Sequence, residues 1–470
     1  MTQSDKIRLF YILSIAGAVI GFLTSFLLLG KLSTDDYGIY TIYITFVSQL
    51  GILSFGFQDG MLINYRKKEH DKVLPLLYRD IKFGYLFQMI ILIITIILIP
   101  ITMKYLFNLP NENIVILILA IISIFPASIL GNFRNAFSAL GEFKKTGYID
   151  FYSKVYLLIS VLILIIFNLD VYTYMILDII FKTFIIIYLT INLKKEIERK
   201  QIKQYEKTEY KFKVVDNFKK GLYILLGNWA FIFVFTMDRS FLSVDPAILG
   251  LYAQSFFLLM ILFQIFLPIK SVLFTTINEK MSEKEIIKII KKICLVGYLL
   301  VALYAFVGYP IIETIIINMK EATDNLDMIF KLDGYNEAFK LSRLITMILP
   351  MYFSIQMVLN NLIMLKRHRT YTIIGIVNLL ISFVIYYSLI KLTNLDLLYA
   401  IVFGTIVNYI ISFILNMVCL VSLKYSIYFF LQFLLSGLIY IVSLEYTILR
   451  PFVIIGLLVM VIYELKKRVE

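Results

Sequence analysis

Apolar stretches of about 20 residues, the length of helix that spans the hydrocarbon core of a bilayer, recur along the whole chain between short polar segments. This pattern predicts an all-α polytopic membrane protein with about fourteen transmembrane helices. The helices are expected, within a few residues at each end, at 10–30, 38–57, 81–101, 114–140, 149–168, 172–192, 221–237, 247–269, 293–318, 343–365, 371–390, 395–418, 427–443 and 450–464.

The composition of the chain narrows its class further. Of its 470 residues, 60% are hydrophobic and 16% are charged, and the mean hydropathy is +0.86. Because soluble domains carry roughly half apolar and a quarter charged residues, a soluble enzyme, a disordered scaffold and a secreted disulfide module are excluded. Cys294 and Cys419 lie in apolar stretches, and His70 and His368 lie in basic loops. No metal site is expected from them.

The distribution of basic residues predicts the orientation. Of the 45 Lys and Arg residues, 35 fall in or beside the loops on one predicted side, nine fall on the other side, and Lys182 lies mid-span. Basic loops are typically cytoplasmic, so an even number of helices with both termini cytoplasmic is predicted. The formal net charge of +13 then reflects topology and attraction to anionic membrane lipids. Nucleic acid is not an expected partner.

A long charged segment divides the chain. Residues 193–220 carry ten basic and five acidic residues and separate two sets of six predicted helices. Because six is even, both sets enter the membrane in the same orientation, as in transporters built from parallel repeats. This predicts an N-lobe at 1–192, a cytoplasmic linker at 193–220, a C-lobe at 221–418, and a peripheral helix pair with a basic tail at 419–470.

Two short segments share the pattern L-S-x-D…G-x-Y and support an internal repeat. They run over 32–40, with Asp35 and Gly38, and over 242–252, with Asp245 and Gly250. Both are predicted to lie outside, and each begins the second helix of its half. The aspartates are suited to cap the N-termini of these helices.

Three segments resemble bacterial flippases for lipid-linked polysaccharide repeat units, which share a superfamily with the multidrug and toxic-compound extruders (MATE). They are LSTDDYGIYTIYITFVSQLGILSFGFQDGMLINY over 32–65, RNAFSALGEFKKTGYID over 134–150, and DRSFLSVDPAILGLYAQS over 238–255. The resemblance covers essentially the whole chain in length and topology, although its motifs are degenerate.

The resemblance implies two six-helix lobes around a central cavity that opens alternately to the two sides. The implied substrate is an oligosaccharide on a polyprenyl diphosphate, moved across the bacterial cytoplasmic membrane for surface polysaccharide such as O-antigen or capsule. A polysaccharide polymerase and other export machinery are implied partners. Sugars and a diphosphate cannot cross hydrocarbon unsolvated, so such a protein must supply a hydrated, cationic path.

Lys182 is the main candidate for substrate binding. It lies ten residues from either end of the predicted span 172–192, and Asp178, four residues earlier, shares its helical face. An ionisable residue at this depth is a functional-site hypothesis, with Lys182 contacting the diphosphate and Asp178 tuning it or taking part in coupling. The alternative is an ion pair that only packs helices.

Two further basic residues near the inner face are candidates for contacts with the substrate. Arg134 ends the fourth predicted span, in the region where the resemblance places a cavity arginine, and Lys154 follows Asp150 by four residues. For both, the alternative is a side chain that extends to the lipid headgroups.

Gating and coupling candidates lie at the ends of spans. Asp238 and Arg239 close the seventh span and are predicted to form an outer gate, with Arg239 also a candidate for substrate binding; the alternative is an interfacial stop. Asp59 follows Gly56 at the polar exit of the second span and is predicted to be a cation or proton site.

Three classes of function remain open. Lys182 and Arg134 favour an anionic substrate and hence the flippase over a multidrug or small-cation antiporter, while a membrane polymerase or glycosyltransferase would need acid–base residues on an outer loop. No Ser–His–Asp or Cys–His arrangement and no G-x-x-x-x-G-K-[ST] phosphate loop occurs in the sequence. We therefore expect a protein that is not an enzyme and uses no cofactor. Coupling to H+ or Na+ stays open.

Overall fold

The structure is a computed structural model in which the described residues form helices joined by short turns. It describes the chain except for residues 1–2, 67, 69, 108–110, 200–213, 257–282, 309, 311–313, 315–334, 365–366, 393–394, 421–436, 438–448 and 467–470.

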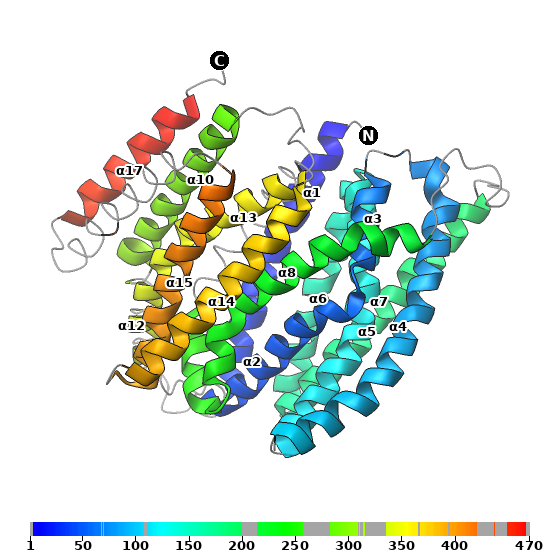
Figure 1. The fold of residues 1–470 in the computed structure, drawn as a ribbon, viewed down its shortest axis with the longest axis horizontal. Helices are drawn as coiled ribbons and strands as arrows, with labels where there is room; N and C mark the ends of the chain where they lie inside the picture. Colours follow the sequence, from blue (N-terminus) through cyan, green and yellow to red (C-terminus); the bar gives the residue numbers. More distant parts are fainter. Residues whose placement is uncertain are drawn as a thin grey trace.

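The N-terminal half of the chain contributes seven described α-helices and one short 3-10 helix. These are α1 (Gln3–Lys31), α2 (Thr34–Gln49), η1 (Leu50–Ser54), α3 (Phe57–Tyr65), α4 (His70–Phe107), α5 (Asn111–Ala139), α6 (Phe143–Ile166) and α7 (Val171–Arg199). In Figure 1 the helices α4–α7 stand together on the right.

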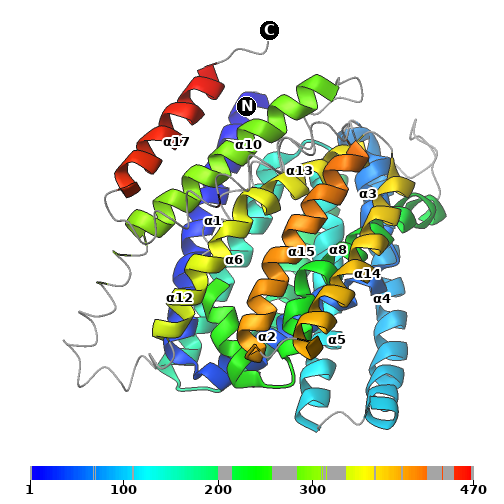
Figure 2. The same cartoon turned by 60° about the vertical axis from the view of Figure 1, so that its left-hand side comes forward.

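The C-terminal half begins with α8 and is described in more separate pieces. Its helices are α8 (Val214–Leu242), α10 (Glu283–Leu303), η3 (Tyr304–Gly308), α12 (Tyr335–Ile345), η4 (Thr346–Ile348), α13 (Leu349–Met364), α14 (His368–Leu392), α15 (Leu397–Leu420) and α17 (Leu449–Lys466). Residues 246–256 are also helical. Figure 2 shows α13, α14 and α15 side by side.

The expected class of an all-α polytopic membrane protein is confirmed. Within the described residues, nine helices are long and apolar enough to cross a membrane, or ten if the bent pair formed by 34–54 and 57–65 counts as one span. Parts of the predicted spans 247–269 and 293–318, and most of 427–443, lie outside the described residues.

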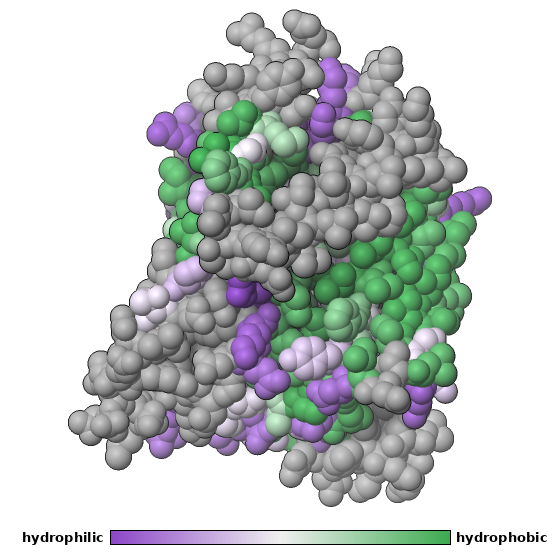
Figure 3. Space-filling model, turned by 90° about the vertical axis from the view of Figure 1, so that its left-hand side faces the viewer, coloured by the Kyte–Doolittle hydropathy of each residue, from purple (hydrophilic) through white to green (hydrophobic). Residues whose placement is uncertain are grey.

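Apolar side chains cover much of the outside of the described helices. Leu86 on α4, Phe184 on α7 and Leu380 on α14 are each more than 60% exposed, which is expected where lipid is the solvent. Figure 3 shows green apolar residues over a broad area at the right of one face, with purple residues near its top and along its lower part.

The predicted span 38–57 corresponds to α2 and η1 within a few residues, and the structure adds a sharp bend at its end. The helix begins earlier, at Thr34, breaks after η1 and continues as α3 at an angle of 63°. Phe55 and Gly56 have φ values of 50° and 76°, in the left-handed region that a helix cannot continue through. Asp59 is therefore not at the polar exit of the span but in the first turn of α3, where it is 6% exposed.

The two repeat motifs contact each other. A Cβ atom added to Gly38 would lie 1.9 Å from the carbonyl oxygen of Pro246, and one added to Gly250 would lie 1.9 Å from that of Thr34. Each glycine thus contacts the residue four positions before the other glycine, a reciprocal pairing expected of a two-fold-related repeat. The beginning of α2 and the end of α8 meet at the bottom of Figure 1.

The caps of the two motifs differ from each other. Ser33 rather than an aspartate caps α2, since its hydroxyl oxygen accepts from the Asp36 backbone N–H at 3.2 Å. In the second motif, Asp245 accepts from the backbone N–H groups of Ala247 and Ile248 at 3.0 and 3.2 Å. The prediction of aspartate caps therefore holds for the second motif alone.

Helices extend into both ends of the predicted linker 193–220. α7 extends to Arg199 and α8 begins at Val214, because the charged residues near both ends continue the helices beyond the apolar spans. The four-region division itself stays a prediction.

The two described ends of the chain lie on the same face, at the top of Figures 1 and 2. We expect reporters inserted within 200–213 and within 319–334 to be on opposite sides of the membrane, with the first cytoplasmic, because the basic residues concentrate there. Labelling from outside the cell with a membrane-impermeant reagent measures this. Labelling of both insertions from outside would overturn the predicted topology.

Candidate functional site

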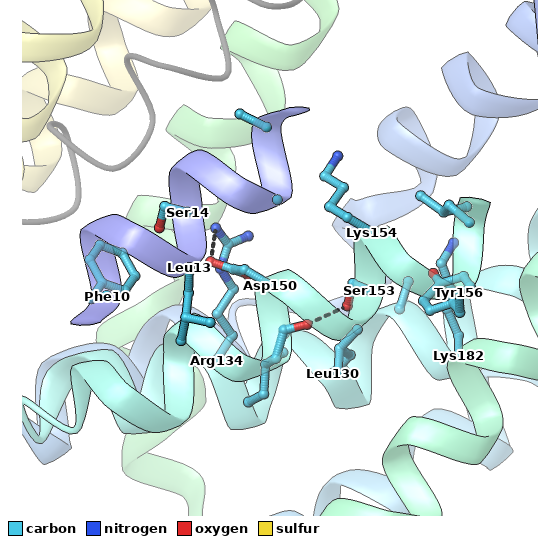
Figure 4. Close-up of a pocket in the computed structure, with 16 residues that line it drawn as sticks. Phe10, Leu13, Ser14, Leu130, Arg134, Asp150, Ser153, Lys154, Tyr156 and Lys182 are labelled. Carbon is cyan, nitrogen blue, oxygen red and sulfur yellow. Dashed lines mark hydrogen bonds and ion pairs between the residues drawn. The ribbon is translucent and has the colours of Figure 1, made fainter. Parts of the chain in front are cut away.

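Four helices of the N-terminal half, α1, α5, α6 and α7, surround a pocket of about 360 Å³. Three of the four basic residues predicted to bind substrate line it: Arg134 from α5, Lys154 from α6 and Lys182 from α7. Their positions are far apart in the sequence, and the helix packing brings them to one cavity. Figure 4 shows the pocket beside Phe10, Leu13 and Ser14 of α1.

Lys182 forms an ion pair with Asp178 one turn earlier on α7. Its Nζ lies 2.5 Å from Asp178 Oδ2, and the two side chains are 17% and 6% exposed. The Asp178 carboxylate also accepts from the hydroxyls of Tyr43 at 3.1 Å and Tyr156 at 3.3 Å. Three donors thus compensate a buried carboxylate, which would otherwise be costly at this depth.

Arg134 and Asp150 form a second pair across α5 and α6. Arg134 Nε lies 3.1 Å from Asp150 Oδ1, and its Nη2 donates to Oδ2 at 3.3 Å. This two-point contact holds the guanidinium plane in a defined orientation. The Arg134 side chain is still 48% exposed, so part of it remains open to a ligand.

Lys154 differs from the other two basic residues. Among the described residues it has no hydrogen bond or ion pair, and in Figure 4 its amino group points away from the Arg134–Asp150 pair. Its side-chain stem passes close to α1, where a Cβ atom added to Gly17 would lie 3.7 Å from Lys154 Cγ. The lysine stem therefore packs beside α1 at Gly17.

The pocket carries a net positive charge. Arg134, Lys154 and Lys182 are the basic residues that line it, whereas Asp150 lines it and Asp178 pairs with Lys182 beside it, which leaves one positive charge in excess. Positive charge in a partly enclosed pocket attracts phosphate, because screening by solvent is lower there than on an open surface.

The structure does not bring Asp238 and Arg239 to this pocket. They lie near the end of α8, where the Asp238 carboxylate accepts from the Tyr252 hydroxyl at 2.5 Å. The Arg239 guanidinium lies over the Phe256 ring at 5.7 Å. Both residues therefore join α8 to the helical segment 246–256, close to the contact between the repeat motifs.

Asp59 lines a different cavity, of about 270 Å³, between the two halves. The N-terminal half contributes residues of η1 and α3, and the C-terminal half contributes residues of α8, α13 and α14. Asn228 of α8 donates to Asp59 Oδ1 at 3.3 Å. This site thus joins the halves directly.

A buried polar network joining α3, α4 and α8 was not predicted from the sequence. Asn217 donates to Asp80 at 2.8 Å and accepts from Asn64 at 2.6 Å, and the Tyr65 hydroxyl donates to Asp80 at 3.0 Å. Asp80 and Asn217 are fully buried. Asp80 lies among basic residues in the sequence, so the hydropathy pattern gave no indication that it is buried.

Solved structures of MATE transporters have the same fold. One is a MOP superfamily transporter from Pyrococcus furiosus, which matches with 12% identity and a TM-score of 0.58 over 90% of this chain and 97% of that chain. That transporter is described as having a binding pocket of reverse polarity that suggests a different function. An outward-facing multidrug resistance MATE family transporter matches with 13% identity and a TM-score of 0.57 over the same shares. A mutant of the Vibrio cholerae MATE transporter VcmN matches with 14% identity and a TM-score of 0.54, over 89% and 97%.

No protein-family model matches the chain, and no curated protein matches it. The structural likeness at this low identity shows the fold: a MATE-type arrangement of helices over nearly the whole chain.

Proposed function

From the MATE-type fold, we propose that this protein is a membrane transporter and that it moves polyprenyl-diphosphate-linked oligosaccharides from the cytoplasmic to the outer leaflet. The observation that carries the substrate class is the basic pocket of Arg134, Lys154 and Lys182. A diphosphate is the part of such a substrate that needs cations, and the sugars need water or hydrogen-bonding groups.

The exposure of the three basic residues fits a reversible anion site. Lys154 has no ion pair among the described residues, and Arg134 remains about half exposed while paired. A phosphate can therefore contact both without first breaking a fully buried ion pair, whereas Lys182 is held by Asp178. We propose that Arg134 and Lys154 bind the anion first and that Lys182 meets it at greater depth.

A multidrug or small-cation antiporter is the second candidate, and the solved structures favour it at least as well. One of those structures is a multidrug resistance MATE family transporter. The cavity between the halves supports this candidate as well, because it holds the carboxylate of Asp59 beside Trp229, Phe231 and Tyr371. A carboxylate among aromatic faces is suited to an organic cation.

Pocket polarity is the feature that separates the two candidates. Within this fold the Pyrococcus furiosus transporter is itself described by a reversed pocket polarity that suggests a different function. For this chain, transport of an anionic substrate should depend on the basic pocket, whereas transport of a cationic substrate should depend on Asp59.

We expect a deletion strain to lose surface glycan and to accumulate lipid-linked repeat units on the cytoplasmic side, because the diphosphate headgroup cannot cross hydrocarbon unaided. Glycan display and extracted lipid-linked intermediates measure this, and the wild-type gene on a plasmid should restore both. Normal glycan display without another flippase, together with increased sensitivity to cationic dyes, would instead establish the antiporter.

A further inference from the structure

A groove of about 770 Å³ lies between α6 and α7, on a different face of α6 from the basic pocket. Thirteen of its sixteen lining residues are apolar or aromatic. Tyr152, Phe184 and Tyr188 among them are each at least half exposed, so the groove opens to the outside of the protein. Exposed apolar side chains are ordinary on a membrane-facing surface, but helices that pack closely leave no hollow of this size between them.

The groove extends from the predicted cytoplasmic interface to about the middle of the membrane. Its three polar lining residues, Lys145, Asn192 and Glu196, lie at the predicted inner ends of α6 and α7, and Ile159 and Phe181 line its other end. The helix from Lys145 to Ile159 is about 20 Å long at 1.5 Å per residue. One leaflet contributes roughly 15 Å of hydrocarbon. The groove therefore has the depth of the cytoplasmic leaflet together with part of its interface.

The groove shares a wall with the basic pocket. Ile149 and Tyr156 of α6 line both. The Tyr156 ring stacks on Phe181 of α7 with centroids 5.7 Å apart, and the Tyr156 hydroxyl donates to Asp178, which holds Lys182. Figure 4 shows Tyr156 and Lys182 together at one end of the basic pocket. At this point the stacked rings are the boundary between a lipid-facing apolar groove and a basic pocket.

We propose that this groove binds the isoprenoid chain of the lipid-linked substrate while the diphosphate lies in the basic pocket, so that the gap between α6 and α7 is a lateral entrance from the cytoplasmic leaflet. This assignment rests on the proposed function and adds a second subsite to it. Within a bilayer a tail is already in an apolar solvent, so packing rather than the hydrophobic effect must select it. A preformed groove with seven aromatic lining residues offers large, rigid surfaces for such packing.

The charges at the inner end of the groove distinguish this substrate from an ordinary phospholipid. Lys145 Nζ lies 2.7 Å from Glu196 Oε2 and 5.1 Å from the centre of the Phe137 ring. A phospholipid with its chain in the groove would place its phosphate at this end, beside a lysine already paired with a carboxylate. The excess positive charge lies instead in the pocket behind the stacked rings. This distribution favours a lipid whose anionic group enters that pocket.

Binding to the purified full-length chain in phosphatidylcholine nanodiscs separates the two subsites. Undecaprenyl diphosphate probes the tail and the headgroup together, whereas inorganic diphosphate probes the headgroup alone. Ile159→Trp places a large ring in the deep end of the groove and should weaken binding of undecaprenyl diphosphate about tenfold, because many small dispersion contacts are lost together. It should leave the binding of inorganic diphosphate unchanged. Lys154→Gln should weaken the binding of both, since it removes a positive charge from the basic pocket.

Ile187→Trp is the matched control. Ile187 lies on α7 and is 49% exposed, against 41% for Ile159, but it does not line the groove. This variant should bind both ligands as the wild type does. If Ile159→Trp does not elute as a folded protein, Ile185→Trp on the opposite wall of the groove provides the same test.

Three results would overturn the assignment. They are a wild-type protein that does not bind undecaprenyl diphosphate, groove variants that bind it as tightly as the wild type, and a selective loss of its binding when phosphatidylglycerol replaces phosphatidylcholine. The last would assign the groove to a membrane phospholipid. Because the assay has no transport step, a protein that shows the expected binding but does not move lipid-linked oligosaccharide would refute the proposed function alone. Transport at the wild-type rate in Ile159→Trp would refute the tail groove alone.

Discussion

Lys182→Glu is expected to abolish transport. The substitution places a second carboxylate one turn from Asp178, whose oxygen now lies 2.5 Å from the lysine amino group, and like charges this close repel strongly at low dielectric. It also leaves the pocket with equal numbers of basic and acidic lining residues. Transport of lipid-linked oligosaccharide in proteoliposomes should fall more than about tenfold, because the pocket would lose its charge excess for the anionic headgroup.

The conservative Lys182→Arg variant is the control for charge. It should keep part of the activity, since the positive charge is retained although the guanidinium fork differs from an ammonium in shape. Gel filtration and the midpoint of thermal unfolding show whether either variant still folds.

A paired variant separates a substrate-binding lysine from a purely structural ion pair. Replacing Asp178 by leucine would leave the hydroxyls of Tyr43 and Tyr156 without their acceptor, so Lys182→Met with Asp178→Asn is the better test. The Asn oxygen can still accept from one tyrosine hydroxyl while its NH2 group donates to the other, and no charge is left unpaired. If this double variant folds and transports at the wild-type rate, Lys182 is structural and the basic-pocket assignment fails.

Hydropathy predicted most of the described helices because membrane helices bury every backbone polar group internally and need only length and apolar side chains. The spans at 114–140, 149–168 and 172–192 agree with α5, α6 and α7 within a few residues at their outer ends. The inner ends of α6 and α7 extend further, to Phe143 and Arg199, since charged residues continue a helix beyond the membrane without affecting its apolar core.

Hydropathy could not reveal the break in the second span, because a broken apolar helix has the same mean hydropathy as a continuous one. The sequence did contain a weak signal, since Gly51, Gly56 and Gly60 interrupt this apolar stretch. Only Gly56 has a positive φ of 76°, while Gly60 is needed for a close approach to the Asn217 carbonyl. The sequence cannot distinguish these two uses of glycine.

The basic residues of the pocket were predicted one at a time, but their grouping was not. Arg134, Lys154 and Lys182 were each identified by charge near or within a span, and the structure adds that α1 closes the same pocket. The tyrosine partners of Asp178 gave no signal among the 33 tyrosines of the chain. Which helices become neighbours depends on side-chain packing across the whole lobe, and that is not a property of any single span.

Gly38→Ala and Gly250→Ala are expected to produce the second large effect, and similar effects to each other. Each added Cβ would lie 1.9 Å from a backbone carbonyl oxygen of the opposing motif. A backbone atom cannot rotate away as a side chain can, so the crossing must widen, at a free-energy cost of about 1–3 kcal/mol or more. Gly456→Ala on α17 is the matched control, because an added Cβ there meets no described residue within 4 Å.

If the proposed transport function holds, the pairing of these two glycines links the sequence repeat to the transport cycle. Both motifs lie on the predicted outer side and both halves contribute to the contact, so a protein that alternately opens and closes must form and break it. We expect each variant to fold, with the packing inside each half intact, and to transport at least about tenfold more slowly. Normal transport in both glycine variants would show that transport does not require this contact.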